Sequence, residues 1–198
     1  MTSTDLGIAA QIAPAAAPHA ALVAAARDVP LTAPTPCGDW DLRALLNHLL
    51  YWTPILAATG RRVAAEPAAP SEQEVDLVVA DWPAALAASR ADLVAAWSDP
   101  AAWTGTVSVG GPDELPAPMI GGMVLGELVV HGWDLGRAVG REPQWPADVL
   151  AAAHEAMLGM AEQGREMGLF GPEVAVPAGA STLDRLLAAS GREPGWTP

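Results

Sequence analysis

The stretch APMIGGMVLGELVVHGWDLGRAVG, residues 117–140, is the clearest helix that the sequence predicts. Pro116 and Pro118 stand at its start and Gly140 at its end, the residue types typical of helix starts and ends. The chain of 198 residues is 51% hydrophobic, and much of that share is alanine. Because alanine has the highest helix propensity of all residues, we predict an all-α protein.

Three polar residues lie on one face of this predicted helix. Glu127 precedes His131 by four residues and Asp134 follows it by three, so their side chains project from the same side. A Glu-x-x-x-His pair can present a carboxylate and an imidazole to one metal ion, with further ligands supplied by a facing helix of a bundle. For Asp134 two interpretations stay open. It holds the other imidazole nitrogen of His131, or it pairs with a buried arginine such as Arg43 or Arg137.

A second helix is predicted from Leu42 to about Gly60, with Asp39 or Asp41 as its cap. Its apolar stripe consists of Leu42, Leu45, Leu46 and Leu49, at the spacing of one helical face. His48 lies on the flank of this stripe and can point to the edge of the core. Together with Glu127 and His131 it makes a set of two imidazoles and one carboxylate, which suits zinc, nickel or iron(II) and leaves coordination positions open.

The remaining elements complete a bundle with long, proline-rich crossover connections. Further helices are predicted over residues 18–28, from 81 or 82 to 97, over 146–168 and over 183–189. Ser71 and Glu74 form a capping box that predicts another helix start. A short strand or extended arm is predicted over 103–109. We expect one domain over residues 1–198. Residues 1–14 fray or form a short leading helix, and residues 169–198 form a loop and a short helix packed on the bundle.

Charge and cysteine content limit the classes of function. The formal net charge of −13 argues against non-specific binding to nucleic acid or an anionic membrane, because both need basic patches. Cys37 is the only cysteine, so no internal disulfide is expected and the cytoplasm is the predicted compartment. With no neighbouring base, Cys37 is interpreted as a packed residue and not as a nucleophile. No signal peptide and no transmembrane helix are predicted.

Two segments of the chain resemble a known family. TPCGDWDLRALLNHL (35–49) and ELVVHGWDLGRAVG (127–140) are similar to the hallmark segments of the mycothiol-dependent maleylpyruvate isomerase N-terminal-like family, part of the DinB-like superfamily of helical-bundle metalloenzymes. LDRLLAASGREPGW (183–196) resembles the tail of its shorter, single-domain, metal-binding members. The resemblance implies a DinB-like four-helix bundle in which His48, Glu127 and His131 bind a divalent metal.

The resemblance also implies a class of reaction. Members of this family use the metal to position or deprotonate a small thiol such as mycothiol, which then attacks an electrophile. Maleylpyruvate isomerase itself resembles a longer protein, with a second domain that helps to complete its active site. We therefore do not expect isomerisation of maleylpyruvate here, but a thiol transferase or an isomerase acting on another small electrophile. A non-catalytic metal-binding module and a purely structural helical protein stay open as alternatives.

A few residues and properties are assigned more loosely. Trp52, one turn beyond His48, is a candidate for the substrate pocket, whereas Trp133 is assigned to core or interface packing. His19 and His154 are interpreted as structural or surface residues. A small thiol and an electrophile are the expected partners, and the chain is expected to be a monomer or a homodimer.

Overall fold

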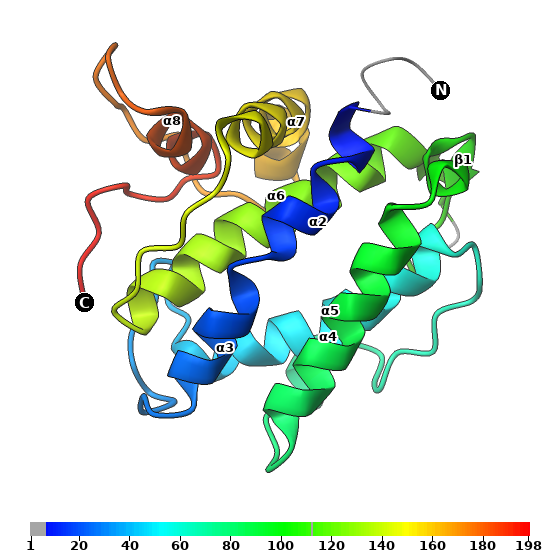
Figure 1. Ribbon diagram of the computed structural model, residues 1–198, viewed down its shortest axis with the longest axis horizontal. Coiled ribbons are helices and arrows are strands. Elements are labelled where there is room, and N and C mark those ends of the chain that lie inside the picture. Colours follow the sequence, from blue (N-terminus) through cyan, green and yellow to red (C-terminus); the bar gives the residue numbers. More distant parts are fainter. Residues whose placement is uncertain (1–6, 112) are drawn as a thin grey trace.

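Two helices carry the residues singled out above, and both begin and end where the sequence chemistry requires. The computed structural model describes residues 7–111 and 113–198 (Figure 1). Helix α4 spans Leu42–Gly60, and the Asp41 side chain caps it by accepting a hydrogen bond from the backbone N–H of Ala44 at 2.9 Å. Helix α6 spans Ala117–Ala138, and Gly140 follows it with φ +66°, a backbone conformation that favours glycine.

Four helical rods form the bundle, and α4 and α6 are two of them. The first rod is α2 (Ile12–Ala16) followed by α3 (His19–Ala26), and α5 spans Trp82–Trp97. The α2–α3 rod packs against α5 and α6, and α4 packs against the same two helices. The largest fully buried side chains include Trp97, Trp103, Leu45, Ile120 and Leu125. This arrangement confirms the predicted all-α, DinB-like bundle.

The C-terminal part of the chain lies outside these four rods. Helix α7 (Ala147–Glu166) packs against α6, and α8 (Thr182–Ala189) packs against α7, as Figure 1 shows at the upper left. Leu186 and Leu187 of α8 are almost completely buried and belong to the main core. Helix α8 is therefore buried against α7 and the main core.

The predicted extended arm is present as one strand of a small hairpin. Strand β1 (Thr106–Val107) pairs antiparallel with β2 (Leu115–Pro116), directly before α6. A 3-10 turn, η2 (Pro100–Trp103), occupies the residues before the hairpin.

The predicted helix start at Ser71 is wrong. The segment forms only a 3-10 turn, η1 (Glu72–Glu74), and the hydroxyl of Ser71 bonds the carboxylate of Glu74 and not a backbone N–H. The cause is Asn47 of α4, whose side chain donates to the carbonyls of Glu72 and Val75 and accepts from the N–H of Leu77. These bonds hold the segment against α4 and occupy backbone groups that would otherwise form the hydrogen bonds of an α-helix.

The N-terminal helical stretch is long and apolar, a feature that was not predicted from the sequence. Gly7–Ala26 is, by length and apolar content alone, the one stretch of the described residues that could cross a membrane. Turns at residues 10–11 and 17–18 interrupt it, and Ile12, Ala15 and Leu22 are buried in the bundle. Length and composition do not separate a core helix from a membrane span. Residues 1–6 of the predicted frayed segment lie outside the described residues.

Candidate metal centre

The structure brings together the three side chains that the sequence analysis selected. His48 comes from α4, whereas Glu127 and His131 come from adjacent turns of α6. The Nε2 atoms of His48 and of His131 each lie 3.4 Å from the same oxygen, Oε2 of Glu127. One nitrogen or oxygen from each residue lies within 4.8 Å of the others. We call these three residues the His–Glu–His cluster.

A second carboxylate forms a hydrogen bond with the other ring nitrogen, Nδ1, of each imidazole. Oδ2 of Asp134 lies 3.0 Å from Nδ1 of His131, and Oε2 of Glu72 lies 2.9 Å from Nδ1 of His48. A carboxylate anion only accepts hydrogen bonds, so both Nδ1 atoms carry the proton and donate it. Both Nε2 atoms are thereby directed at Glu127. This carboxylate–histidine arrangement recurs behind histidine ligands of metals, because it sets the orientation of the ring.

The electrostatics of the cluster favour charged groups. Burial alone would lower the pKa of His48, but the hydrogen bonds and charges of Glu127 and Glu72 outweigh it and raise the pKa to about 9. Burial alone would raise the pKa of Glu127, but the charges of His131, His48 and Arg192, with a hydrogen bond from His48, lower it to about 2. Without a metal, a proton on His48 therefore balances the Glu127 carboxylate, and a bound cation would take the place of that proton.

The chemistry of the cluster fits a divalent metal. Two imidazole nitrogens and one carboxylate oxygen are a ligand set typical of catalytic zinc, and the same set suits nickel and iron(II). The side chain of Glu127 remains 29% exposed, so the cluster is reached from solvent. Three protein ligands also leave coordination positions for water or a substrate.

Two tryptophans border the cluster. Trp40 packs with its ring centroid 4.9 Å from that of His48, and it stacks on His131 at 6.2 Å with an interplanar angle of 11°. Trp52 lies 6.4 Å from the ring of His48, and its indole N–H donates to Glu72 at 3.1 Å. Trp52 thus lies beside the cluster. Trp133 is buried in the core, and its ring centroid lies 5.9 Å from the guanidinium carbon of Arg137.

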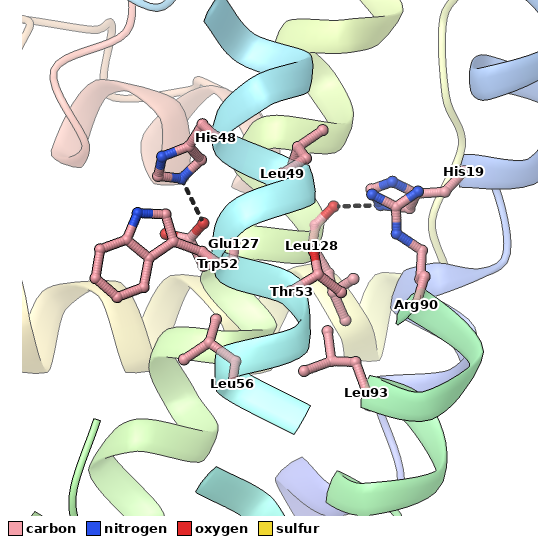
Figure 2. Close-up of a pocket in the computed structure, with 10 residues that line it drawn as sticks. All are labelled: His19, His48, Leu49, Trp52, Thr53, Leu56, Arg90, Leu93, Glu127 and Leu128. Atoms are coloured by element: carbon pink, nitrogen blue, oxygen red, sulfur yellow. Dashed lines mark hydrogen bonds and ion pairs between the residues drawn. The ribbon is translucent and has the colours of Figure 1, made fainter. Parts of the chain in front are cut away.

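A small cavity borders the inner side of the cluster (Figure 2). Figure 2 shows His48, Glu127 and Trp52 on one side of α4 and His19 and Arg90 on the other. The cavity measures about 10 Å³, which is room for about one water molecule and none for a substrate. A substrate that reaches the cluster must therefore approach from the solvent-exposed side.

The remaining histidines lie outside the cluster. His19 is 1% exposed, its Nε2 lies 2.7 Å from the carbonyl oxygen of Leu128, and burial lowers its pKa well below the ordinary value. His154 lies on α7, and partial burial lowers its pKa.

Cys37 lies close to the cluster, but its surroundings argue against a second cation there. Burial raises the pKa of its thiol to about 12, so the thiol is protonated at neutral pH. Its Sγ lies within 4.8 Å of ligand atoms of His131 and Asp134. However, the guanidinium of Arg192 lies 2.9 Å from that sulfur and 3.0 Å from Asp134, and this positive charge repels a metal ion.

The structure combines the two interpretations that were open for Asp134. Its carboxylate bonds His131 and also pairs with a buried arginine, but that arginine is Arg192. Arg43 instead pairs with Asp76, and Arg137 donates to the carbonyl of Trp196.

Three neighbours of the cluster were not predicted from the sequence, namely Trp40, Glu72 and Arg192. Trp40 stands in the quoted segment 35–49, whereas nothing in the spacing of Glu72 or Arg192 links them to a histidine.

Known proteins resemble this chain over most of its length. Residues 12–136 match the family described as the mycothiol maleylpyruvate isomerase N-terminal domain, a stretch that includes the whole His–Glu–His cluster. Two uncharacterized proteins of Mycobacterium tuberculosis, from strains CDC 1551 / Oshkosh and ATCC 25618 / H37Rv, are each 30% identical over 178 residues, covering 87% of this chain and 91% of the relative. No solved structure matches the chain. Because the family match spans more than half of the sequence, this chain belongs to the family of the mycothiol maleylpyruvate isomerase N-terminal domain.

Proposed function

We propose that the chain binds one divalent metal ion, with zinc the best suited, through His48, Glu127 and His131. The observation that carries this proposal is the approach of two imidazole Nε2 atoms to one oxygen of Glu127, each at 3.4 Å. Carboxylates hold both rings by their other nitrogen, which leaves Nε2 as the ligand atom. Nickel and iron(II) accept the same ligands and would be identified by elemental analysis.

The metal serves a reaction between a low-molecular-weight thiol of the mycothiol type and a small electrophile, as a transferase or an isomerase. The family of the chain supports the choice of thiol. A bound divalent cation lowers the pKa of a thiol or water that it binds, and so supplies a nucleophile near neutral pH. Because the pKa of Cys37 is raised to about 12, the reacting thiol comes from a small molecule and not from the protein.

The residues around the cluster position these reactants. Glu72 and Asp134 hold the imidazoles in place, so that the ligand atoms are arranged before a metal or a thiol arrives. Trp40 and Trp52 offer apolar surface beside His48, suited to an apolar part of a thiol or an electrophile.

A non-catalytic metal-binding module, with a regulatory or stress-related role, is the second candidate. It is favoured by the absence of an available general base among the described residues at the cluster. Asp134 is fully buried, and its carboxylate is engaged by His131 and Arg192. The Glu72 carboxylate is likewise engaged by His48 and Trp52. The neighbouring cavity also has room for only about one water molecule.

The first test is the metal content of protein purified without a histidine tag. Elemental analysis compares the wild type with His48→Ala, Glu127→Ala and the control His154→Ala, which removes a histidine of α7 outside the cluster. We expect about one metal ion per chain in the wild type and the control, and loss of the metal in the other two variants. A wild type that takes up no zinc, nickel or iron(II) after reconstitution contradicts metal binding.

A second test separates the enzyme from the binding module. The metal-loaded protein is incubated with mycothiol and a panel of small electrophiles, and both the loss of free thiol and the conversion of each electrophile are followed over time. Thiol loss that requires Glu127 supports a transferase, whereas thiol-dependent conversion of an electrophile without net thiol loss supports an isomerase, which releases the thiol again. A protein that retains its metal but neither consumes thiol nor converts any electrophile supports the non-catalytic module.

A further inference from the structure

We propose that Arg192, in the C-terminal segment, positions His131 by holding the carboxylate of Asp134; this inference rests on the metal site proposed above. Nη2 of Arg192 lies 3.0 Å from Oδ2 of Asp134, and its Nε lies 3.4 Å from Oδ1. The same Oδ2 lies 3.0 Å from Nδ1 of His131. The carboxylate of Asp134 therefore links Arg192 to Nδ1 of His131.

Arg192 matters to the site because the carboxylate that it binds, that of Asp134, is buried. Asp134 is 0% exposed and Arg192 is 8% exposed, so water does not solvate the pair. A buried carboxylate needs a positive partner, because the interior does not replace the lost hydration. The planar guanidinium approaches both carboxylate oxygens and so restricts rotation of the carboxylate, which a single point charge does less well. With the carboxylate held, its bond to Nδ1 determines the direction of the imidazole Nε2.

The packing of α8 brings Arg192 to this place. A capping box between Ser181 and Asp184 begins the helix, and Leu187 is buried in the core. Gly191 follows the helix with φ +82°, and the backbone N–H of Arg192 bonds the carbonyl of Leu187 at 2.9 Å. This turn directs the guanidinium toward α6.

Arg192 also lies outside residues 12–136, the part of the chain that matches the family. We infer that the C-terminal segment is a component of the site and not an appendage to it. Among the described residues, the arginine that pairs with Asp134 comes from this segment and not from the matched region.

The test measures zinc affinity in the full-length chain by competition with a chromophoric chelator. The variants are Arg192→Met, Arg192→Lys, Asp134→Asn and the double variant Asp134→Asn/Arg192→Met. The matched control is Arg137→Met, because Arg137 holds the same segment through the carbonyl of Trp196, whereas the ion pairs of Asp134 among the described residues are with His131 and Arg192. Circular dichroism verifies that each variant is folded.

We expect Arg192→Met to weaken zinc binding about tenfold, Arg192→Lys to weaken it less, and Arg137→Met to leave it within about twofold of the wild type. If Arg192 acts through Asp134, the double variant loses no more affinity than Asp134→Asn alone. This comparison holds even if Arg192→Met does not fold, because the double variant buries no unpaired charge.

Two results would overturn the inference. One is a double variant whose loss is the sum of two independent losses, and the other is unchanged affinity in both Asp134→Asn and the double variant. If the wild type itself binds no zinc, the proposed function fails and this inference fails with it. Zinc binding in the wild type with no effect of these variants contradicts only the role of Arg192.

Discussion

Oε2 of Glu72 lies 2.9 Å from Nδ1 of His48, although 24 residues separate the two in the sequence. The same oxygen accepts a hydrogen bond from the indole N–H of Trp52 at 3.1 Å. A residue of the connection between α4 and α5 thus fixes one imidazole of the cluster and one of its tryptophans. Asp134 does the same for His131 from within α6. Both rings are held before any metal binds.

Replacing Glu72 with Gln tests this hold. A neutral amide accepts a weaker hydrogen bond than a carboxylate, so His48 loses part of its orientation and basicity. We expect zinc affinity to fall about tenfold or more, measured by chelator competition. Glu74→Gln is the control, because Glu74 lies in the same 3-10 turn but bonds Ser71. Equal affinities in the two variants would show that Glu72 does not support the ligand.

Metal affinity should depend on pH through His48. Without metal, the pKa of His48 is about 9, so a proton occupies this imidazole at neutral pH and must leave when a metal binds. Affinity should therefore rise by up to about tenfold per pH unit as pH rises toward 9, and level off above it. Isothermal titration calorimetry in buffers of different ionisation enthalpy measures the released proton. No release at pH 7 would contradict the raised pKa.

The stability of the metal-free protein should show the opposite dependence. The raised pKa of His48 stabilises the fold fully below pH 6.5, the ordinary histidine value, and this contribution is lost as pH rises through about 9. At about 1.4 kcal/mol per pKa unit, we expect a loss of at most about 3.5 kcal/mol, measured by urea unfolding. The lowered pKa of Glu127 contributes above about pH 4.5 and is lost toward pH 2.

His48→Gln provides the control for this pH dependence. The variant removes the titrating imidazole, so its free energy of unfolding should vary much less between pH 6.5 and 9. A wild type and a variant with parallel curves over this interval would contradict the assignment to His48.

Gly191→Ala should be more disruptive than an ordinary glycine substitution. Gly191 has φ +82°, and a Cβ atom there would lie 2.7 Å from Cα of Gly171. Gly140, with φ +66°, has no atom within 4 Å of such a Cβ, so Gly140→Ala costs only the backbone strain of about 1–2 kcal/mol. We expect a larger loss of unfolding free energy for Gly191→Ala in denaturant titrations. We also expect weaker zinc binding, because the turn positions Arg192. Equal losses in the two variants would contradict the close contact.

Arg90→Met should stabilise the protein. Arg90 is 7% exposed, burial lowers its pKa to about 10, and among the described residues its Nε has no hydrogen-bond partner. The charge is therefore buried at a cost that methionine avoids, and we expect the free energy of unfolding to rise by about 1 kcal/mol. Arg43→Met, which removes an exposed ion pair with Asp76, should change it by about 0.5 kcal/mol or less. Destabilisation by Arg90→Met would indicate a compensating partner.

The sequence by itself determined the helices and the faces they present. Helical periodicity is local, so the boundaries of α4 and α6 and the shared face of Glu127 and His131 follow from spacing alone. The flank position of His48 was readable in the same way. The failure at Ser71 shows the limit, because the side chain of Asn47, from another element, took the backbone groups that the predicted helix required.

Only the tertiary structure decided which residues surround the cluster. Asp134 could pair with any buried arginine as far as the sequence showed, and the turn after α8 selected Arg192, 58 residues away. Glu72 reached His48 because Asn47 held its segment against α4. Such contacts are made between elements that are far apart in the sequence, and their geometry depends on how whole helices pack. Periodicity within one helix carries no information about that packing.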